Sequence, residues 1–340
     1  MKKFYAVIGN PPYQEDVEGN GRANPIYPDF MDASYSVGEK VELITPARFL
    51  FNAGQTPKAW NKKMLEDKHL AVLEYVANGA EVFPNTDIKG GVAITYRDEK
   101  HANKAIGVFV AHDELNSIMG KVSAQQESSI SDIVTGAVPY RFTDLVRKEH
   151  PEFVSEIGES FDLRTNILDK LNGKLFFSEA QPGEESIAIF GLVNRKRNCL
   201  WIKRCYISVP NNFGGYKVLV PKASGSGTYG EKLAELFVAT SNVGHTQSFV
   251  SIGNLKTEDE ATALSNYLKT KFTRSLLGIL KVTQDITSRV WELVPQQDFT
   301  SASDIDWSQS VADIDRQLYK KYGLSEDEIT FIESHVKEMK

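Results

Sequence analysis

The sequence predicts an α/β domain with an incomplete, mostly parallel sheet, followed by an α+β region. Strand and helix patterns alternate over the first hundred residues, which is typical of α/β folds. Only two clear helices accompany the four strands there, so one side of the sheet is expected to be missing. The alternation stops near residue 100, and residues 186–255 are rich in strand patterns separated by Asn/Gly turns.

The first strand is the apolar run 4–8, which we expect to be buried and to end at Gly9-Asn10-Pro11-Pro12. Apolar spacing then predicts the following elements in order: a helix over 25–35, a strand over 41–45, a helix over 60–68, a strand over 70–76 and a strand over 91–96.

The rest of the chain predicts a more irregular set of elements. They are a helix over 160–171, strands over 187–192, 200–209, 216–220 and 248–252, one long helix over 258–280, and two short helices within 313–339. Ser325 and Glu328 have the spacing of a capping box for the last helix. The expected domains are therefore 1–100, 101–257 and 258–340.

Composition is that of a globular protein: 340 residues, 41% of them hydrophobic, suffice for two domains. Cys199 and Cys205 fit neither a disulfide framework nor a zinc site, so no metal is expected and the compartment is expected to be the reducing cytoplasm. No apolar run approaches the roughly 20 residues of a membrane helix.

The most informative motif is Asn10-Pro11-Pro12-Tyr13, directly after the first strand. It resembles the catalytic tetrapeptide of amino-group DNA methyltransferases, in the form typical of N6-adenine enzymes. The alternative is a simple loop, because Pro-Pro is a strong breaker of regular structure. A strand just before the motif is the context that the catalytic interpretation requires.

The resemblance implies a definite chemistry for these residues. The lone pair of an adenine amine is delocalised into the ring, and two acceptors facing its hydrogens favour a tetrahedral nitrogen. The Asn10 side-chain oxygen and the Pro11 carbonyl are the expected acceptors. Tyr13 is expected to stack on an adenine rotated out of the duplex. Methyl transfer from S-adenosylmethionine then depends mainly on in-line positioning.

Two further segments carry the resemblance. Residues 43–50 (Leu-Ile-Thr-Pro-Ala-Arg-Phe-Leu) resemble the family's next strand-Pro element, and Glu81-Val82-Phe83-Pro84 resembles its late hairpin. Phe83 is therefore expected on the opposite face of the flipped base, although a hydrophobic contact holding the loop is the alternative. The order of motifs is that of gamma-class enzymes of restriction–modification systems. The implied fold is the C-terminal half of a class I methyltransferase sheet, followed by an α+β target-recognition domain.

One departure from the family concerns the cofactor. Members carry a Gly-rich cofactor loop and an acidic ribose-binding residue upstream of the tetrapeptide, and here nine residues precede it. We therefore expect an incomplete S-adenosylmethionine site and an N-terminal half as partner. The chain would then be an engineered fragment, a truncated reading frame or one half of a split enzyme.

Charge is distributed unevenly along the chain. The net charge is −6, yet residues 191–235 contain eight Lys/Arg and two Glu. A local basic region of this kind predicts contact with double-stranded DNA, although a solvated charged turn is the bland alternative. The expected DNA-binding residues are Arg195, Lys196, Arg197, Lys203, Arg204, Lys217 and Lys222. His245, in a polar turn, is expected to be structural.

Three hypotheses follow from these patterns. The chain is part of a DNA adenine methyltransferase, a DNA-recognition module that is inactive by itself, or a non-catalytic relic that keeps the motif. The family resemblance favours the first, and the missing cofactor loop favours the second for this polypeptide alone.

Overall fold

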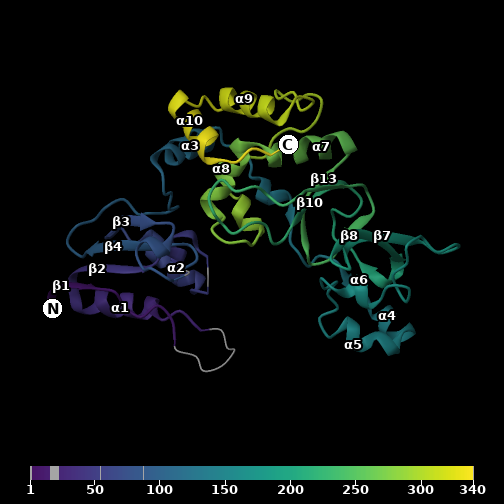
Figure 1. The fold of residues 1–340 in the computed structure, drawn as a ribbon, viewed down its shortest axis with the longest axis horizontal. Helices are drawn as coiled ribbons and strands as arrows, with labels where there is room; N and C mark the ends of the chain where they lie inside the picture. Colours follow the sequence, from purple (N-terminus) through teal and green to yellow (C-terminus); the bar gives the residue numbers. More distant parts are fainter. Residues whose placement is uncertain (1, 16–22, 54, 87, 340) are drawn as a thin grey trace. The chain divides into compact units, whose positions relative to one another are not determined.

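The computed structural model describes residues 2–15, 23–53, 55–86 and 88–339 (Figure 1). The chain forms two compact units, Met1–Leu115 and Asn116–Lys340. Among the described helices, none combines the length and the apolar character needed to cross a membrane.

The first unit is built on one four-stranded sheet in the order β1-β2-β4-β3. Its strands are β1 (Phe4–Gly9), β2 (Gly38–Pro46), β3 (Leu70–Val76) and β4 (Val92–Asp98). Helix α1 (Tyr27–Val37) connects β1 to β2, and the 3-10 helix η1 (Ala47–Phe51) and helix α2 (Lys58–Glu66) connect β2 to β3. All six predicted elements are present.

The prediction of a mostly parallel sheet needs a correction. Strands β1 and β2 are parallel, but β4 is antiparallel to both of its neighbours, β2 and β3. The connection between β3 and β4, residues 77–91, has among its described residues the short 3-10 helix η2 (Gly79–Glu81) and no α-helix. Parallel strands are usually joined by a crossover that contains an α-helix, whereas this connection returns the chain as an antiparallel neighbour of β3.

Strand β1 is not the buried strand that its apolar sequence predicted. It lies at the edge of the sheet, and Phe4, Tyr5 and Ile8 are 57%, 69% and 76% exposed. Because alternate side chains of a strand point to opposite faces, exposure of both Phe4 and Tyr5 leaves both faces of β1 open. Apolar composition alone does not distinguish a central strand from an uncovered edge.

The second unit contains three small sheets. The first has the order β11-β10-β13-β5, the second β12-β7-β8 and the third β6-β9. The strands are β5 (Val134–Thr135), β6 (Arg141–Phe142), β7 (Ser186–Val193), β8 (Lys196–Lys203), β9 (Ile207–Ser208), β10 (Tyr216–Pro221), β11 (Phe237–Ala239), β12 (Val243–His245) and β13 (Phe249–Leu255). Three of the predicted strands correspond to β7, β10 and β13. The predicted strand 200–209 is instead divided between β8 and β9 by the 3-10 helix η5 (Arg204–Tyr206).

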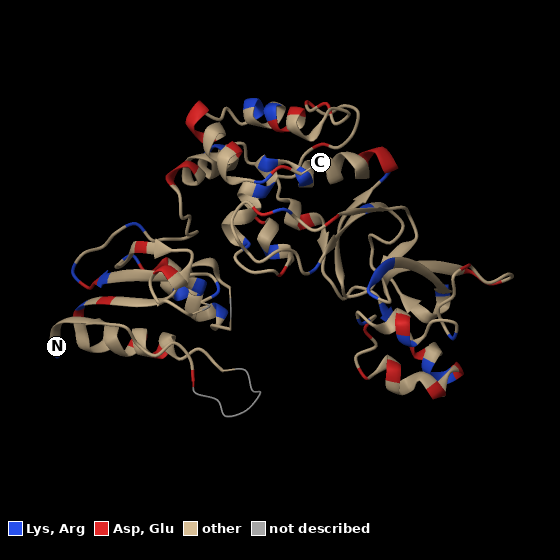
Figure 2. Cartoon of the chain, viewed as in Figure 1, with Lys and Arg blue, Asp and Glu red and all other residues tan. Residues whose placement is uncertain are grey.

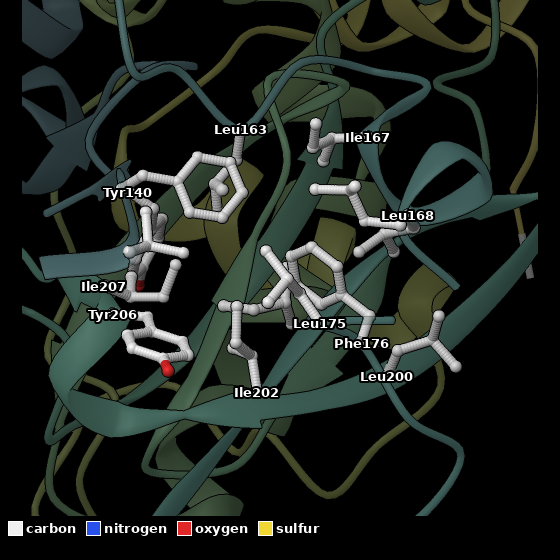
Figure 3. Packing of buried hydrophobic residues seen from close by; sticks show 14 of the residues in the cluster. Tyr140, Leu163, Ile167, Leu168, Leu175, Phe176, Leu200, Ile202, Tyr206 and Ile207 are labelled. Carbon is white, nitrogen blue, oxygen red and sulfur yellow. The ribbon is translucent and has the colours of Figure 1, made fainter. Parts of the chain in front are cut away.

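One hydrophobic cluster packs the β7–β8 hairpin against the preceding irregular segment (Figure 3). Leu200 and Ile202 of β8 meet Leu168 and Phe176 there. The predicted helix 160–171 is reduced to α6 (Ile167–Lys170), and the nearby helices α4 (Asp144–Glu149) and α5 (Val154–Ile157) are also short. The apolar residues of segment 160–171 pack into this cluster and do not form one continuous helix face.

The C-terminal helices belong to the same compact unit as these sheets. The predicted helix 258–280 is divided into α7 (Glu258–Lys269) and α8 (Lys271–Leu280). Thr270 has an extended backbone between them, and its hydroxyl accepts a hydrogen bond from the Thr273 amide, so it caps α8. Helix α7 packs on β10, β11 and β13.

Two tail helices follow, α9 (Val311–Lys321) and α10 (Glu326–His335). The capping box of Ser325 and Glu328 is present as predicted. Helix α3 (Asp113–Ala124) was not predicted, and its Lys121 forms an ion pair with Glu328 at 2.6 Å.

Candidate active site

The tetrapeptide lies at the carboxyl end of β1, beside the carboxyl end of β2. Gly9 pairs with Leu43, so β2 continues to Pro46 past the point where β1 stops. The ends of neighbouring parallel strands form the usual binding crevice of an α/β sheet. A cavity of about 660 Å³ opens there. Its lining includes Asn10, Pro11, Pro12 and Tyr13, together with Phe83.

Backbone hydrogen bonds hold the tetrapeptide loop in place. The Ile26 amide donates to the Tyr13 carbonyl at 3.2 Å, and the Glu15 amide donates to the Asn24 carbonyl at 2.9 Å. The segment that enters α1 is thereby tied to the loop that leaves β1. Asn10 is exposed and Tyr13 is half-buried, so the asparagine side chain is available to a ligand.

Tyr13 and Phe83 are in contact across the cavity. Their ring centroids are 6.2 Å apart and their planes are inclined at 76°, an edge-to-face pair. A base held between two parallel rings needs a separation of about 7 Å, twice the usual carbon contact distance. The two rings line one cavity, but in this edge-to-face arrangement they leave no room for a planar base between them.

The loop that carries Phe83 is short and locally hydrogen-bonded. The Phe83 amide donates to the Gly79 carbonyl at 2.8 Å, and the Thr86 hydroxyl donates to the Phe83 carbonyl at 2.6 Å. Phe83 is only half-buried. A half-buried ring on an irregular segment can rotate at lower cost than one in a packed core.

Burial raises the pKa of Tyr13 to about 12. The Tyr13 hydroxyl has no hydrogen-bond partner among the described residues. The phenol is therefore protonated at neutral pH, and its ring offers an uncharged face for stacking.

Several cavity residues had no role in the sequence-based predictions, and three of them carry groups that can bind a ligand. They are Arg48 on η1, Tyr27 at the start of α1 and Thr56 before α2. Arg48 lies inside the strand-Pro segment 43–50, so the sequence motif includes it although it was given no role. No sequence pattern indicated Tyr27 or Thr56. Among the described residues that line the cavity, Arg48 is the one charged side chain.

Comparisons with known proteins bear on the first unit. Residues 1–83 match the family model of the Eco57I restriction-modification methylase. The chain is also 27% identical over 111 residues to an uncharacterized adenine-specific methylase of Mycoplasma pneumoniae, covering 31% of this chain and 26% of that protein.

The resemblance to restriction–modification adenine methylases is confirmed. The chain spans about a quarter of the length of this Mycoplasma methylase. It is also similar to the type IIG restriction endonuclease BpuSI, with 11% sequence identity and a TM-score of 0.32, covering 97% of this chain and 52% of that one.

The predicted DNA-binding residues of the second unit do not form one patch. Asn194 and Arg195 form the two-residue turn between β7 and β8, and both have positive φ, 49° and 61°. This is the backbone of a type I′ hairpin turn, in which Gly is usual at the second position. Arg195 and Lys196 are exposed at this tip, as predicted.

Figure 2 shows that acidic segments accompany the basic ones along the second unit. Three other basic residues of the region have partners within this unit. Arg197 forms an ion pair with Glu235 at 2.9 Å, and Lys203 forms one with Glu184 at 2.6 Å. Arg204 donates to the Ile207 carbonyl at 2.7 Å. The two ion pairs reduce the positive potential that the count of charges along the chain predicted. Lys222 is exposed.

Lys217 is wrong as a DNA contact because its side chain is fully buried. Its ammonium donates to the carbonyls of Asn212, Phe213 and Gly215 at 2.9–3.2 Å. Burial lowers the pKa of Lys217 to about 8. Lys217 holds the loop before β10 together and cannot reach a phosphate.

No chemical role is indicated for His245 or for the two cysteines, Cys199 and Cys205. His245 is fully buried, and burial lowers its pKa to about 4. Both cysteines are free thiols. Within the described ranges, no three His, Cys, Asp or Glu side chains are grouped to hold a metal ion.

Proposed function

We propose that this chain is the catalytic-motif and target-recognition part of a site-specific DNA methyltransferase that methylates N6 of an extruded adenine. The observation that carries the proposal is the cavity lined by Asn10, Pro11, Tyr13 and Phe83 at the carboxyl end of β1. Its volume of about 660 Å³ falls within the usual range of small-ligand sites.

Each tetrapeptide residue has a task that its chemistry allows. The Asn10 amide oxygen and the Pro11 carbonyl accept hydrogen bonds from the adenine amine. Those bonds favour a tetrahedral nitrogen whose lone pair points away from the purine ring. Tyr13 supplies the stacking face, and Phe83 turns to cover the other face of the base.

The described residues fit the adenine side of the reaction better than a complete S-adenosylmethionine site. S-adenosylmethionine would supply the methyl group, but no carboxylate among the described cavity residues is available for its ribose hydroxyls. The open edge and both open faces of β1 support a neighbouring cofactor-binding half that pairs with this strand. Gamma-class membership is part of the same proposal.

The second unit is proposed to position double-stranded DNA. The support is the β7–β8 tip, where Arg195 and Lys196 are exposed. Phosphate contacts of this kind set register on a duplex and carry no sequence information by themselves. A DNA-recognition module without activity of its own is the second candidate, and the uncovered β1 favours it for this polypeptide taken alone.

The base-binding step is testable with the chain as it is. Stacking on Tyr13 quenches the fluorescence of 2-aminopurine 2′-deoxyriboside, and loss of one stacking ring weakens binding by about tenfold or more. We expect that loss in Tyr13→Ala and near-normal affinity in Tyr13→Phe. Tyr5→Ala, which removes an exposed tyrosine outside the cavity, is the matched control. Equal affinity of Tyr13→Ala and the native chain would overturn the proposal.

The cofactor side has a separate test. Calorimetry of the chain with S-adenosylmethionine is expected to show no binding at micromolar concentrations. Clear micromolar binding would contradict the incomplete site and leave the adenine assignment intact.

A further inference from the structure

We propose that Arg48, Tyr27 and Thr56 form an anion site in the cavity that binds a phosphate group adjoining the extruded adenosine. The inference rests on the proposed function, because it assigns a second binding element to the same cavity. It adds three residues that the tetrapeptide chemistry does not use.

Contacts with residues 89 and 90 fix the side chain of Arg48. Its Nε donates to the Lys89 carbonyl at 2.5 Å. Its aliphatic stem lies against Gly90, where an added Cβ would stand 3.0 Å from the Arg48 Cγ. Gly90 also has φ of +83°, so this close approach depends on glycine.

The remaining donors of Arg48 are available to a ligand. Among the described residues, Arg48 has no carboxylate partner, and its Nη atoms form no hydrogen bond. Guanidinium groups bind phosphate with paired, charge-assisted hydrogen bonds. A cation that lines a cavity without a counter-charge favours an anionic ligand.

Two buried hydroxyl groups face the same space. Tyr27 and Thr56 line the cavity and are only 2% and 7% exposed. Neither hydroxyl forms a hydrogen bond of good geometry within the part of the chain that the structure describes, although the Thr56 hydroxyl and the Phe49 backbone lie near enough to the Tyr27 hydroxyl to lower its pKa. Burial of a hydroxyl without a hydrogen-bond partner is unfavourable, and a bound acceptor would satisfy it.

The three groups are close enough to act on one ligand. Burial raises the pKa of Tyr27, and the neighbouring Thr56 hydroxyl and Arg48 guanidinium act in the opposite direction. Both hydroxyls donate hydrogen bonds, and a phosphate offers several acceptor oxygens. An adenine that enters beside Asn10 and Tyr13 carries phosphates on its sugar, so the substrate itself brings the anion into this cavity.

The experiment compares a nucleoside with its phosphates. Deoxyadenosine and its 5′- and 3′-monophosphates are titrated into the full chain, and affinity is measured from NMR shift changes of the cavity residues. We expect one monophosphate to bind about tenfold more tightly than deoxyadenosine, as one charged hydrogen-bond pair allows. Arg48→Gln should abolish this preference, so that the variant binds the monophosphates no more tightly than deoxyadenosine.

Two conservative variants and one control variant show whether a lost preference comes from the anion site or from a misfolded chain. Thr56→Val and Tyr27→Phe keep the packing volume and should each reduce the preference about threefold to fivefold. Lys62→Gln, which removes a positive charge from α2 outside the cavity, should retain the full preference. Thermal unfolding verifies that each variant is folded.

The outcomes separate this inference from the proposed function. Equal binding of deoxyadenosine and both monophosphates by the native chain overturns the anion site and leaves the base pocket standing. A phosphate preference that survives in Arg48→Gln also overturns it. No binding of any of the three probes overturns the base pocket and the anion site together.

Discussion

The tetrapeptide cavity of the first unit and the basic region of the second unit gave opposite outcomes. Asn10, Tyr13 and Phe83 are separated by up to 73 positions in the sequence, and the sheet brings all three to one cavity. The basic residues between 191 and 235 are neighbours in the sequence, but one of them is buried and two are neutralised by ion pairs. A motif that requires a backbone context predicted which residues lie together better than a local charge count did.

The largest expected effect tests the first half of this comparison. In enzyme reconstituted with an S-adenosylmethionine-binding half, Asn10→Ala should lower methyl transfer at least about a hundredfold, the scale for loss of one preorganised hydrogen-bonding group. Transfer of labelled methyl to duplex DNA measures it. Asn103→Ala, an exposed asparagine outside the cavity, should retain activity. Turnover retained in Asn10→Ala would remove the catalytic role of the tetrapeptide.

An intermediate effect tests the second half. Arg195→Ala combined with Lys196→Ala should weaken duplex binding about tenfold and reduce the slope of log affinity against log salt by about 2. Lys203→Gln should change little, because Lys203 is already paired with Glu184 at 2.6 Å. Fluorescence anisotropy over a series of salt concentrations gives both quantities. A larger effect of Lys203→Gln would mean that the count of charges along the sequence predicts DNA contacts better than exposure and ion pairing do.

The last expected effect concerns stability and Lys217. Because burial lowers its pKa to about 8, the folded chain binds fewer protons than the unfolded chain from about pH 8 up to the unfolded pKa of about 10.4. The free energy of unfolding should therefore rise with pH in this window. Urea unfolding should show the native chain gaining roughly 2 kcal/mol more than Lys217→Met between about pH 7.5 and about pH 10. Equal gains would mean that Lys217 titrates as an exposed lysine does.

Local signals predicted elements well wherever the chain itself determines them. The capping box of Ser325 and Glu328 and the limits of β3, residues 70–76, are present as predicted. Thr270 shows the limit, because apolar spacing continues through 258–280 while its extended backbone separates two helices. Periodicity reports which residues face the core and does not report a change of helix direction.

The candidate site was predicted in part for a related reason. Asn10, Tyr13 and Phe83 stand in recognisable motifs, so the sequence alone named them. Tyr27, the first residue of α1, and Thr56, before α2, come together with the tetrapeptide only in the folded chain. Their unpartnered hydroxyls are visible only in three dimensions.

The uncovered edge of β1 has a consequence for the behaviour of this polypeptide outside the cell. Unpaired backbone amides and carbonyls beside Phe4 and Ile8 form a template on which a second copy can add its own strand. Purified alone at high concentration, the polypeptide is expected to aggregate through cross-chain strand addition. Solubility during preparation would then depend on whether that edge is occupied.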